Sequence, residues 1–199
     1  MNIKTNLGLV LIAAFMLGGC STYVERLDTQ EVIDLSGAWN DTDSQLVARE
    51  MIEDSLSRPW INNFAKAEGK DPAVIIGTIK NLSHEHINTN TFVANMEREL
   101  INSGKVQFVA SSSARNEIRD ERADQDLNAT DDTRKAAKQE YGADFMMQGQ
   151  INTIIDIDGK TQVRFYQVNL ELISLKDNRK VWIGEKKIKK LVRNSKLRE

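Results

Sequence analysis

The sequence predicts an α/β domain in which helices pack on a mixed sheet of about five strands. Two observations support this prediction. A helical pattern lies between an apolar, β-branched run at 73–79 and a shorter apolar run at 106–109, which is the order of a βαβ unit. Three segments between 145 and 188 then alternate apolar and polar residues and are separated by turn sequences, as in a three-stranded antiparallel meander.

The domain is expected to begin with a helix that ends before Pro59, because proline cannot continue a helix. Thr42 or Asp43 can cap this helix. Its apolar residues recur with roughly helical spacing at Leu46, Val47, Ile52 and Leu56. Residues 60–71 contain two adjacent asparagines and a glycine, so we expect a loop there from which an aromatic side chain can reach the core.

The run at 73–79 is almost continuously apolar, which predicts a strand covered on both faces. A second helix is expected to begin at Asn90 or Thr91 and to end at Gly104, where a left-handed conformation is convenient. The apolar residues 106–109 follow directly and predict a second strand. A parallel pairing with a right-handed crossover is the default for this arrangement.

Residues 111–125 and 130–141 are mostly charged and are expected to form solvated helices. The meander begins at 145–157, where apolar residues occupy the odd positions. A second strand is expected at 163–175 and a third at 181–188, before a basic tail. The turns between them are predicted at the Asp-Gly pair 158–159 and at the polar stretch 176–179.

The first 20 residues have the pattern of a bacterial lipoprotein signal. Lys4 gives a positive start, residues 7–17 are uncharged and apolar, and two glycines precede Cys20, the only cysteine. An apolar run of this length is too short for a transmembrane helix, which needs roughly 18 residues or more. We therefore expect cleavage between Gly19 and Cys20 and lipid attachment to the Cys20 thiol. The alternative is an ordinary secretory signal that is cleaved elsewhere.

These features predict three parts: a signal peptide at 1–19, a lipidated flexible tether at 20–41 and the α/β domain at 42–199. Ser21, and not an aspartate, follows Cys20, which resembles the pattern of lipoproteins released to the outer membrane. We expect the protein there, facing the periplasm. This compartment excludes nucleic acid, and a formal net charge of −2 argues against a surface that binds polyanions.

No residue pattern predicts catalysis, a metal or a cofactor. His84 and His86 are two residues apart and could contribute to a metal site or an acid–base pair, but the chain has no other histidine and no free cysteine. Turn and capping bonds in a loop explain these polar residues better. The serines at 111–113 have no adjacent base, and no glycine-rich phosphate loop is present.

Two features could bind a protein partner. Phe165 shares a strand face with Gln167 and Asn169, so it could anchor a partner, or it could be core if a second helix covers that face. The basic tail includes Lys186 and Lys187. It could contact an acidic partner or anionic wall polymers, or it could keep an edge strand from unwanted pairing, which we favour.

Three blocks of sequence, in this order and spacing, resemble a known family. They are NLSHEHINT at 81–89, SGKVQFV at 103–109, and RFYQVNLEL at 164–172 with KVWIGEKKIKK at 180–190. They are similar to the penicillin-binding protein activator LpoB family of outer-membrane lipoproteins. The resemblance implies a fold similar to the N-terminal domain of TolB, and docking on the accessory region of a class A (bifunctional) penicillin-binding protein, which it stimulates without catalysis. A structural adaptor in an envelope assembly is the alternative, supported by a short tether without proline.

Overall fold

The computed structural model describes residues 23–28, 31–135 and 140–193, in two compact units, Met1–Val32 and Ile33–Glu199. The described residues of the first unit contain neither helix nor strand. The expected signal peptide, with Gly19 and the lipid-attachment residue Cys20, lies outside the described residues.

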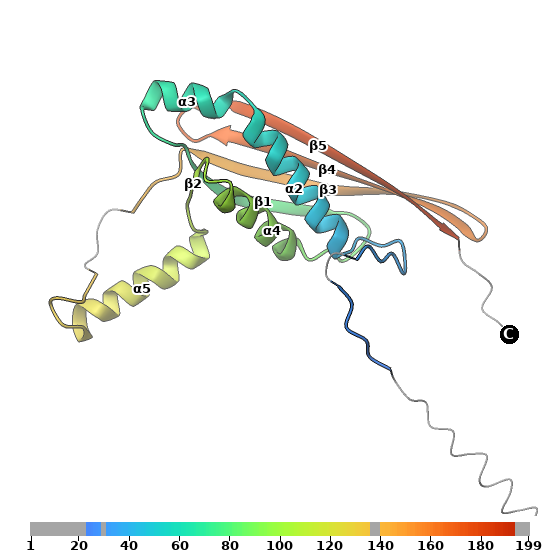
Figure 1. Cartoon of the computed structure of the whole chain (residues 1–199), viewed down its shortest axis with the longest axis horizontal. Coiled ribbons are helices and arrows are strands. Elements are labelled where there is room, and N and C mark those ends of the chain that lie inside the picture. The colour runs from blue at the N-terminus through green and yellow to red at the C-terminus, as the bar shows by residue number, and fades with distance from the viewer. Residues whose placement is uncertain (1–22, 29–30, 136–139, 194–199) are drawn as a thin grey trace, which may run out of the picture. The chain divides into compact units, whose positions relative to one another are not determined.

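The second unit is built on a five-stranded sheet with the strand order β2-β1-β3-β4-β5 (Figure 1). The strands are β1 (Ala73–Leu82), β2 (Gln107–Phe108), β3 (Phe145–Asp158), β4 (Thr161–Ser174) and β5 (Lys180–Arg193). β1 pairs in parallel with β2 and with β3, and β3, β4 and β5 form an antiparallel meander. The predicted fold class, a βαβ unit followed by a meander in a mixed sheet, is therefore confirmed.

In the described residues, four helices accompany the sheet: α2 (Asp41–Ser57), α3 (Trp60–Glu68), α4 (Thr89–Asn102) and α5 (Ser112–Asn128). α2 and α4 lie side by side on one face of the sheet (Figure 1). α2 begins with a capping box, in which the Asn40 side chain accepts from the Asp43 amide and the Asp43 carboxylate accepts from the Asn40 amide, both at 3.0 Å. This arrangement satisfies two N–H groups that a helix otherwise leaves unpaired.

The loop that we expected at 60–71 is wrong, because α3 occupies most of it. Pro59 has a φ of −62°, which already fits a helix, and Gly69 closes the helix with a φ of 68°. Trp60 and Phe64 are four residues apart and both pack edge-on against Phe145, at 5.1 and 5.2 Å between ring centroids. This packing stabilises a helix whose two asparagines favour a loop locally.

The helix expected at 130–141 is also wrong in its described part, because 130–135 and 140–141 form turns and irregular chain. The neighbouring prediction at 111–125 is confirmed by α5, which buries none of its side chains. The third meander strand is longer than predicted, since β5 continues through the basic stretch to Arg193.

The core lies between the sheet and the pair α2 and α4. α2 turns five apolar residues inward and α4 turns three, and β4 contributes every second residue. The buried side chains include Val47, Met51, Ile52, Phe92, Met96, Leu100, Val168, Leu170, Leu172 and Trp182. A smaller cluster of Ala73, Ile75 and Val109 forms on the opposite face of β1, so the prediction of a strand buried on both faces is confirmed for 73–76. It is wrong for Thr78, which is exposed.

Candidate docking surface

The meander strands present their second face to solvent. In β3 and β5, the residues that point away from the helices include Ile154, Ile183 and Leu191, which are 65%, 66% and 56% exposed. Single exposed apolar residues are normal on a protein surface, but contiguous ones indicate a binding site. The strand register decides which of these residues are neighbours.

Three neighbouring rows of this face contain the residues that the sequence singles out. Phe165 of β4 pairs with Ile154 of β3 and Lys189 of β5. The next row pairs Gln167 with Asn152 and Lys187, and the row after it pairs Asn169 with Gln150 and Glu185. We define the open-face patch as Ile154, Phe165, Gln167, Asn169, Lys187, Lys189 and Leu191.

The open-face patch has an apolar end and a polar end. Phe165 is half-buried between its strand neighbours, and Val163 and Leu191 form the adjacent row. No helix packs over Phe165 in the part of the chain that the structure describes. At the polar end, the Gln167 amide donates to Asn169 Oδ1 at 3.0 Å. The patch therefore offers an aromatic anchor beside hydrogen-bonding groups.

Lys186 and Lys187, which the sequence groups together, lie on opposite faces of β5. Lys187 belongs to the open face and contacts Glu185 at 2.5 Å. Lys186 lies on the helix-covered face and forms an ion pair with Glu50 of α2. The two lysines therefore cannot form one contact surface, and only Lys187 is part of the open-face patch.

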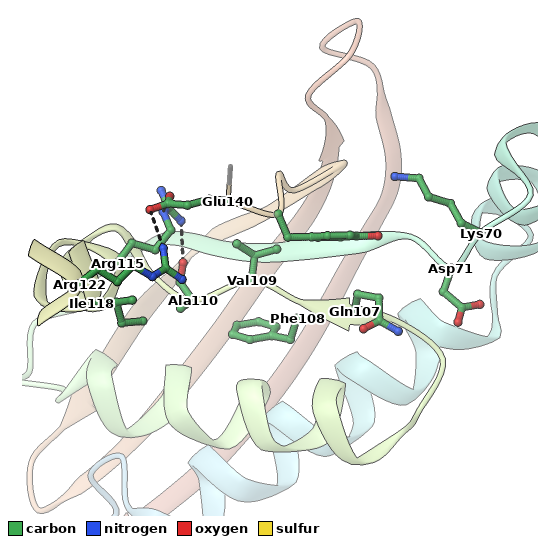
Figure 2. Close-up of a pocket in the computed structure, with 11 residues that line it drawn as sticks. Lys70, Asp71, Gln107, Phe108, Val109, Ala110, Arg115, Ile118, Arg122 and Glu140 are labelled. Carbon is green, nitrogen blue, oxygen red and sulfur yellow. Dashed lines mark hydrogen bonds and ion pairs between the residues drawn. The ribbon is translucent and has the colours of Figure 1, made fainter. Parts of the chain in front are cut away.

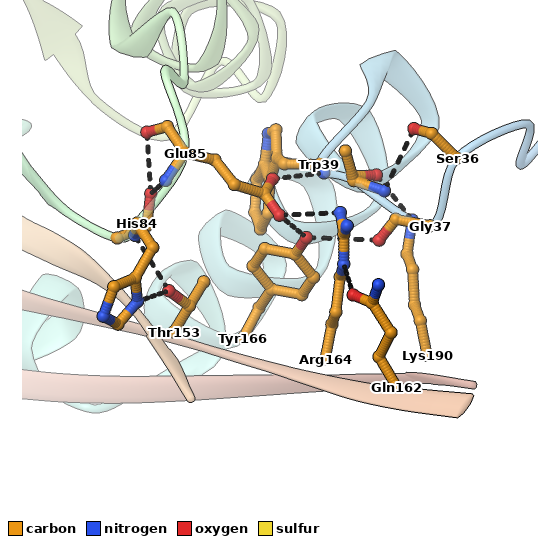
Figure 3. A network of polar contacts seen from close by, with 12 residues as sticks. Ser36, Gly37, Trp39, His84, Glu85, Thr153, Gln162, Arg164, Tyr166 and Lys190 are labelled. Carbon is orange, nitrogen blue, oxygen red and sulfur yellow. Dashed lines mark hydrogen bonds and ion pairs between the residues drawn. The ribbon is translucent and has the colours of Figure 1, made fainter. Parts of the chain in front are cut away.

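Behind the patch, a polar network lies on the opposite face of the same strands (Figure 3). Glu85, in the loop after β1, accepts hydrogen bonds from Tyr166 Oη at 2.7 Å and from Arg164 Nη1 at 3.0 Å. Its second carboxylate oxygen accepts from the Trp39 amide at 3.0 Å. Burial and the bond to Glu85 raise the pKa of the Tyr166 phenol above its usual value. Arg164 and Tyr166 flank Phe165, so the network holds the backbone that presents the anchor.

The same network holds residues 33–40, which we call the strap. Lys190 Nζ lies 2.6 Å from both Asp34 and Asp43 and 3.2 Å from the Ala38 carbonyl. Burial opposes the charge on Lys190, but the two carboxylates outweigh it and raise the pKa of this amine. Trp39 packs edge-on against Tyr166, at 5.6 Å between ring centroids. Contacts between the expected tether and the domain therefore begin already at Asp34.

The two histidines contribute to the loop that carries Glu85. His84 Nδ1 lies 3.0 Å from Thr153 Oγ1, and the side chains of both His84 and His86 are exposed. Among the described residues, no three potential metal ligands gather at one place. The Asn88 side chain accepts from the Asn90 amide and caps α4, as expected for the polar residues of this loop.

These observations define the class of the domain: an α/β domain with helices on one face of a mixed sheet and a meander whose other face is open to solvent. The chain matches the family described as peptidoglycan-synthase activator LpoB over residues 43–188 and belongs to this family. The family is regulatory rather than catalytic, and its partner is a peptidoglycan synthase of the cell envelope. Activation of such a synthase is therefore the function of this chain.

Several solved structures have a similar fold at low identity. The LpoB C-terminal domain from Escherichia coli is 12% identical with a TM-score of 0.40, and the match covers 71% of this chain and 97% of that one. The solution structure of E. coli LpoB is 12% identical with a TM-score of 0.42, and the match covers 89% of this chain and 84% of that one. Lipoprotein GNA1162 from Neisseria meningitidis is 12% identical with a TM-score of 0.41, and the match covers 63% of this chain and 88% of that one. Similarities at this level of sequence identity do not identify functional residues in this chain.

A search of curated proteins found no match. No helix in the described part of the chain is long and apolar enough to cross a bilayer.

Proposed function

We propose that this chain activates a class A, bifunctional penicillin-binding protein from the outer membrane, to which an acylated Cys20 anchors it, and that it does so without catalysing a reaction. The sequence around Gly19 and Cys20 supports the anchor. The observation that carries the docking proposal is the exposure of Ile154 and Leu191, at 65% and 56%, beside the aromatic ring of Phe165.

The open-face patch has the composition of an interface centre with a polar rim. Full burial of an isoleucine or leucine side chain contributes roughly 1.5–3 kcal/mol, so covering Ile154 and Leu191 contributes at most about 3–6 kcal/mol to binding. Phe165 adds an aromatic anchor of the kind that dominates interface energies. Lys187 and Lys189 at the rim favour a partner with carboxylates around an apolar centre.

Activation follows from preferential binding. A docked domain shifts its partner toward the active conformation only as far as its affinities for the two conformations differ. The long meander strands and the network around Glu85 keep the open-face patch in one geometry, so little binding energy is spent on ordering it. The lipid anchor restricts where this docking can occur.

Two substitutions on the same strand test the docking face. Ile154→Asp places a charge in the patch, whereas Ile157→Asp changes a residue of nearly equal exposure, 62%, that points to the other face. We expect Ile154→Asp to weaken binding of the synthase at least tenfold and to abolish stimulation of glycan polymerisation by the full chain in detergent. Equal activity of the two variants would reject the open-face patch.

The anchor is tested separately. Cells grown with labelled palmitate should label the wild-type protein and not Cys20→Ser. If neither protein carries the label, the N-terminal segment is an ordinary secretory signal. Fractionation of wild-type cells should then place the labelled protein in the outer membrane.

The reach of the tether favours a second candidate function, a structural adaptor between envelope proteins. The strap belongs to the domain unit, so only residues 20–32 of the expected tether remain outside it, and a chain of this length spans at most about 45 Å when fully extended. Cross-linking in intact cells separates the candidates. An activator should capture an inner-membrane synthase, whereas an adaptor should capture proteins of the outer membrane or periplasm.

A further inference from the structure

The two edges of the sheet differ in how they resist pairing with another strand. The β5 edge carries four lysines between 186 and 190, and such charges protect an edge. The β2 edge, in contrast, has no charged residue between Val106 and Ala110. Its length of two residues limits the pairing that it can offer. A ligand that adds to β2 would therefore need a second point of attachment.

One residue of β2 offers its backbone to such a ligand. The amides of Gln107 and Val109 donate to the Pro72 and Val74 carbonyls of the β1 segment, both at 2.9 Å. Backbone groups alternate in direction along a strand, so the N–H and C=O of Phe108 point away from β1. Neither group has a hydrogen-bond partner among the described residues.

A cavity of about 670 Å³ runs along this free edge (Figure 2). Four consecutive residues, 107–110, form one wall, and residues of α5 with Glu140 and Tyr141 form the other. At about 3.3 Å per residue, that wall is long enough for three or four residues of an extended peptide. Exposed Tyr141 and half-buried Phe108 supply apolar surface for alternate side chains of such a peptide.

The second point of attachment is a cluster of arginines at the end of the cavity. Arg115, Arg119 and Arg122 share one face of α5 and surround a single carboxylate, Glu140, at 3.7, 2.7 and 3.8 Å. Of the acidic residues of α5, only Asp126 shares this face, and it lies one turn beyond Arg122. A bidentate hydrogen bond from Arg119 holds the pKa of Glu140 below its usual range. Three guanidinium groups with one carboxylate leave a local excess of positive charge.

Arg115 connects this cluster to the strand edge. Its Nη1 donates to the Ala110 carbonyl at 2.6 Å, which fixes the chain just after β2. The free edge of Phe108 and the arginine cluster therefore have a fixed geometry relative to each other. Extended backbone fits the first feature and a carboxylate fits the second.

We propose that the β2 edge and the arginines of α5 form a binding site for an extended, acidic segment of a protein partner, which adds to the sheet as a sixth strand. The peptide backbone pairs with the N–H and C=O of Phe108. A glutamate or aspartate side chain of the peptide binds Arg115 and Arg122 beside Glu140. This site lies on a different part of the domain from the open-face patch and does not depend on that assignment.

A direct binding experiment uses a short fluorescent peptide of alternating threonine and glutamate, with a matched peptide in which lysine replaces glutamate. Fluorescence anisotropy with the full chain in detergent should show binding of the glutamate peptide that weakens as salt is added. Amide resonances of the nitrogen-15-labelled chain should shift at Phe108 and Ala110. The lysine peptide should not bind, and equal binding of both peptides, or of neither, would overturn the proposal.

Three variants separate backbone pairing from charge. Phe108→Pro removes the outward N–H and leaves the bonds to β1 intact, whereas Phe108→Ala removes only the ring. We expect Phe108→Pro to bind at least tenfold more weakly than Phe108→Ala. The double variant Arg115→Gln and Arg122→Gln keeps the edge and should lose the preference for glutamate over lysine. Thermal unfolding checks each fold, and if Phe108→Pro does not fold, retained glutamate preference in the arginine variant alone refutes the site.

Discussion

Replacing Tyr166 by phenylalanine should destabilise the domain by about 1.5–3 kcal/mol, the usual contribution of a hydrogen bond to a charged group. The Tyr166 side chain is fully buried, and its hydroxyl donates to the Glu85 carboxylate at 2.7 Å. Phenylalanine keeps the ring and its packing against Trp39, so no large cavity forms. The cost therefore comes from the lost hydrogen bond to Glu85 Oε1, which keeps only the bond from Arg164.

Urea unfolding of the full chain measures this cost. The urea concentration at the unfolding midpoint should fall. The m value, which is the slope of the unfolding free energy against urea concentration, should stay the same because the surface exposed on unfolding does not change. For a domain of this size, each kcal/mol lowers the melting temperature by roughly 2–4 °C, so we expect a loss of about 3–12 °C. Tyr141→Phe is the matched control, because Tyr141 is 57% exposed and its hydroxyl forms no hydrogen bond with any residue that the structure describes.

The double variant with Glu85→Gln completes a mutant cycle. If the hydroxyl and the carboxylate stabilise each other, the losses of unfolding free energy in the two single variants should add up to more than the loss in the double variant. A change below about 0.5 kcal/mol for Tyr166→Phe, equal to that of a surface control, would show that the network contributes nothing to stability.

Three further predictions concern the same core. The pKa of Tyr166 is raised above 10.0, so the unfolded chain ionises first, and above pH 10 wild type should lose stability more steeply than Tyr166→Phe in urea titrations. Ser55→Ala should be neutral or stabilising by calorimetry, because the buried Ser55 hydroxyl has no hydrogen-bond partner within the described part of the chain. Gly149→Ala should cost more than about 2 kcal/mol in urea unfolding, because its Cβ would lie 2.1 Å from the Asn169 carbonyl oxygen.

Periodicity predicted most of the fold because the sheet buries one face of the meander strands. Val168, Leu170 and Leu172 alternate with polar residues, and a two-residue pattern fixes both the strand and its buried face. The sequence pattern did not predict α3, and the reason is physical. Its stability comes from Trp60 and Phe64 packing on Phe145, about 80 residues further along the chain, and a local pattern contains no information about that contact.

The candidate surface was only partly predictable. The alternation in β4 placed Phe165, Gln167 and Asn169 on one face, but only the strand register brings Ile154 and Leu191 beside them. The sequence grouped Lys186 with Lys187, although alternation along β5 separates neighbours onto opposite faces. The network around Glu85 could not be predicted, because its members come from four distant segments and no spacing connects them.

Consecutive residues of β4 have separate tasks, which allows contact and support to be distinguished. Phe165 faces outward in the open-face patch, whereas Arg164 and Tyr166 face inward and hold Glu85 and the strap. Tyr166→Phe therefore leaves the chemistry of the patch unchanged and loosens only its support. If this variant stays folded and still loses stimulation of the synthase, activation depends on a rigid patch. If stimulation persists at reduced stability, the contact residues alone suffice for activation. In that case Phe165→Ala, which removes a contact residue, should abolish stimulation of the synthase.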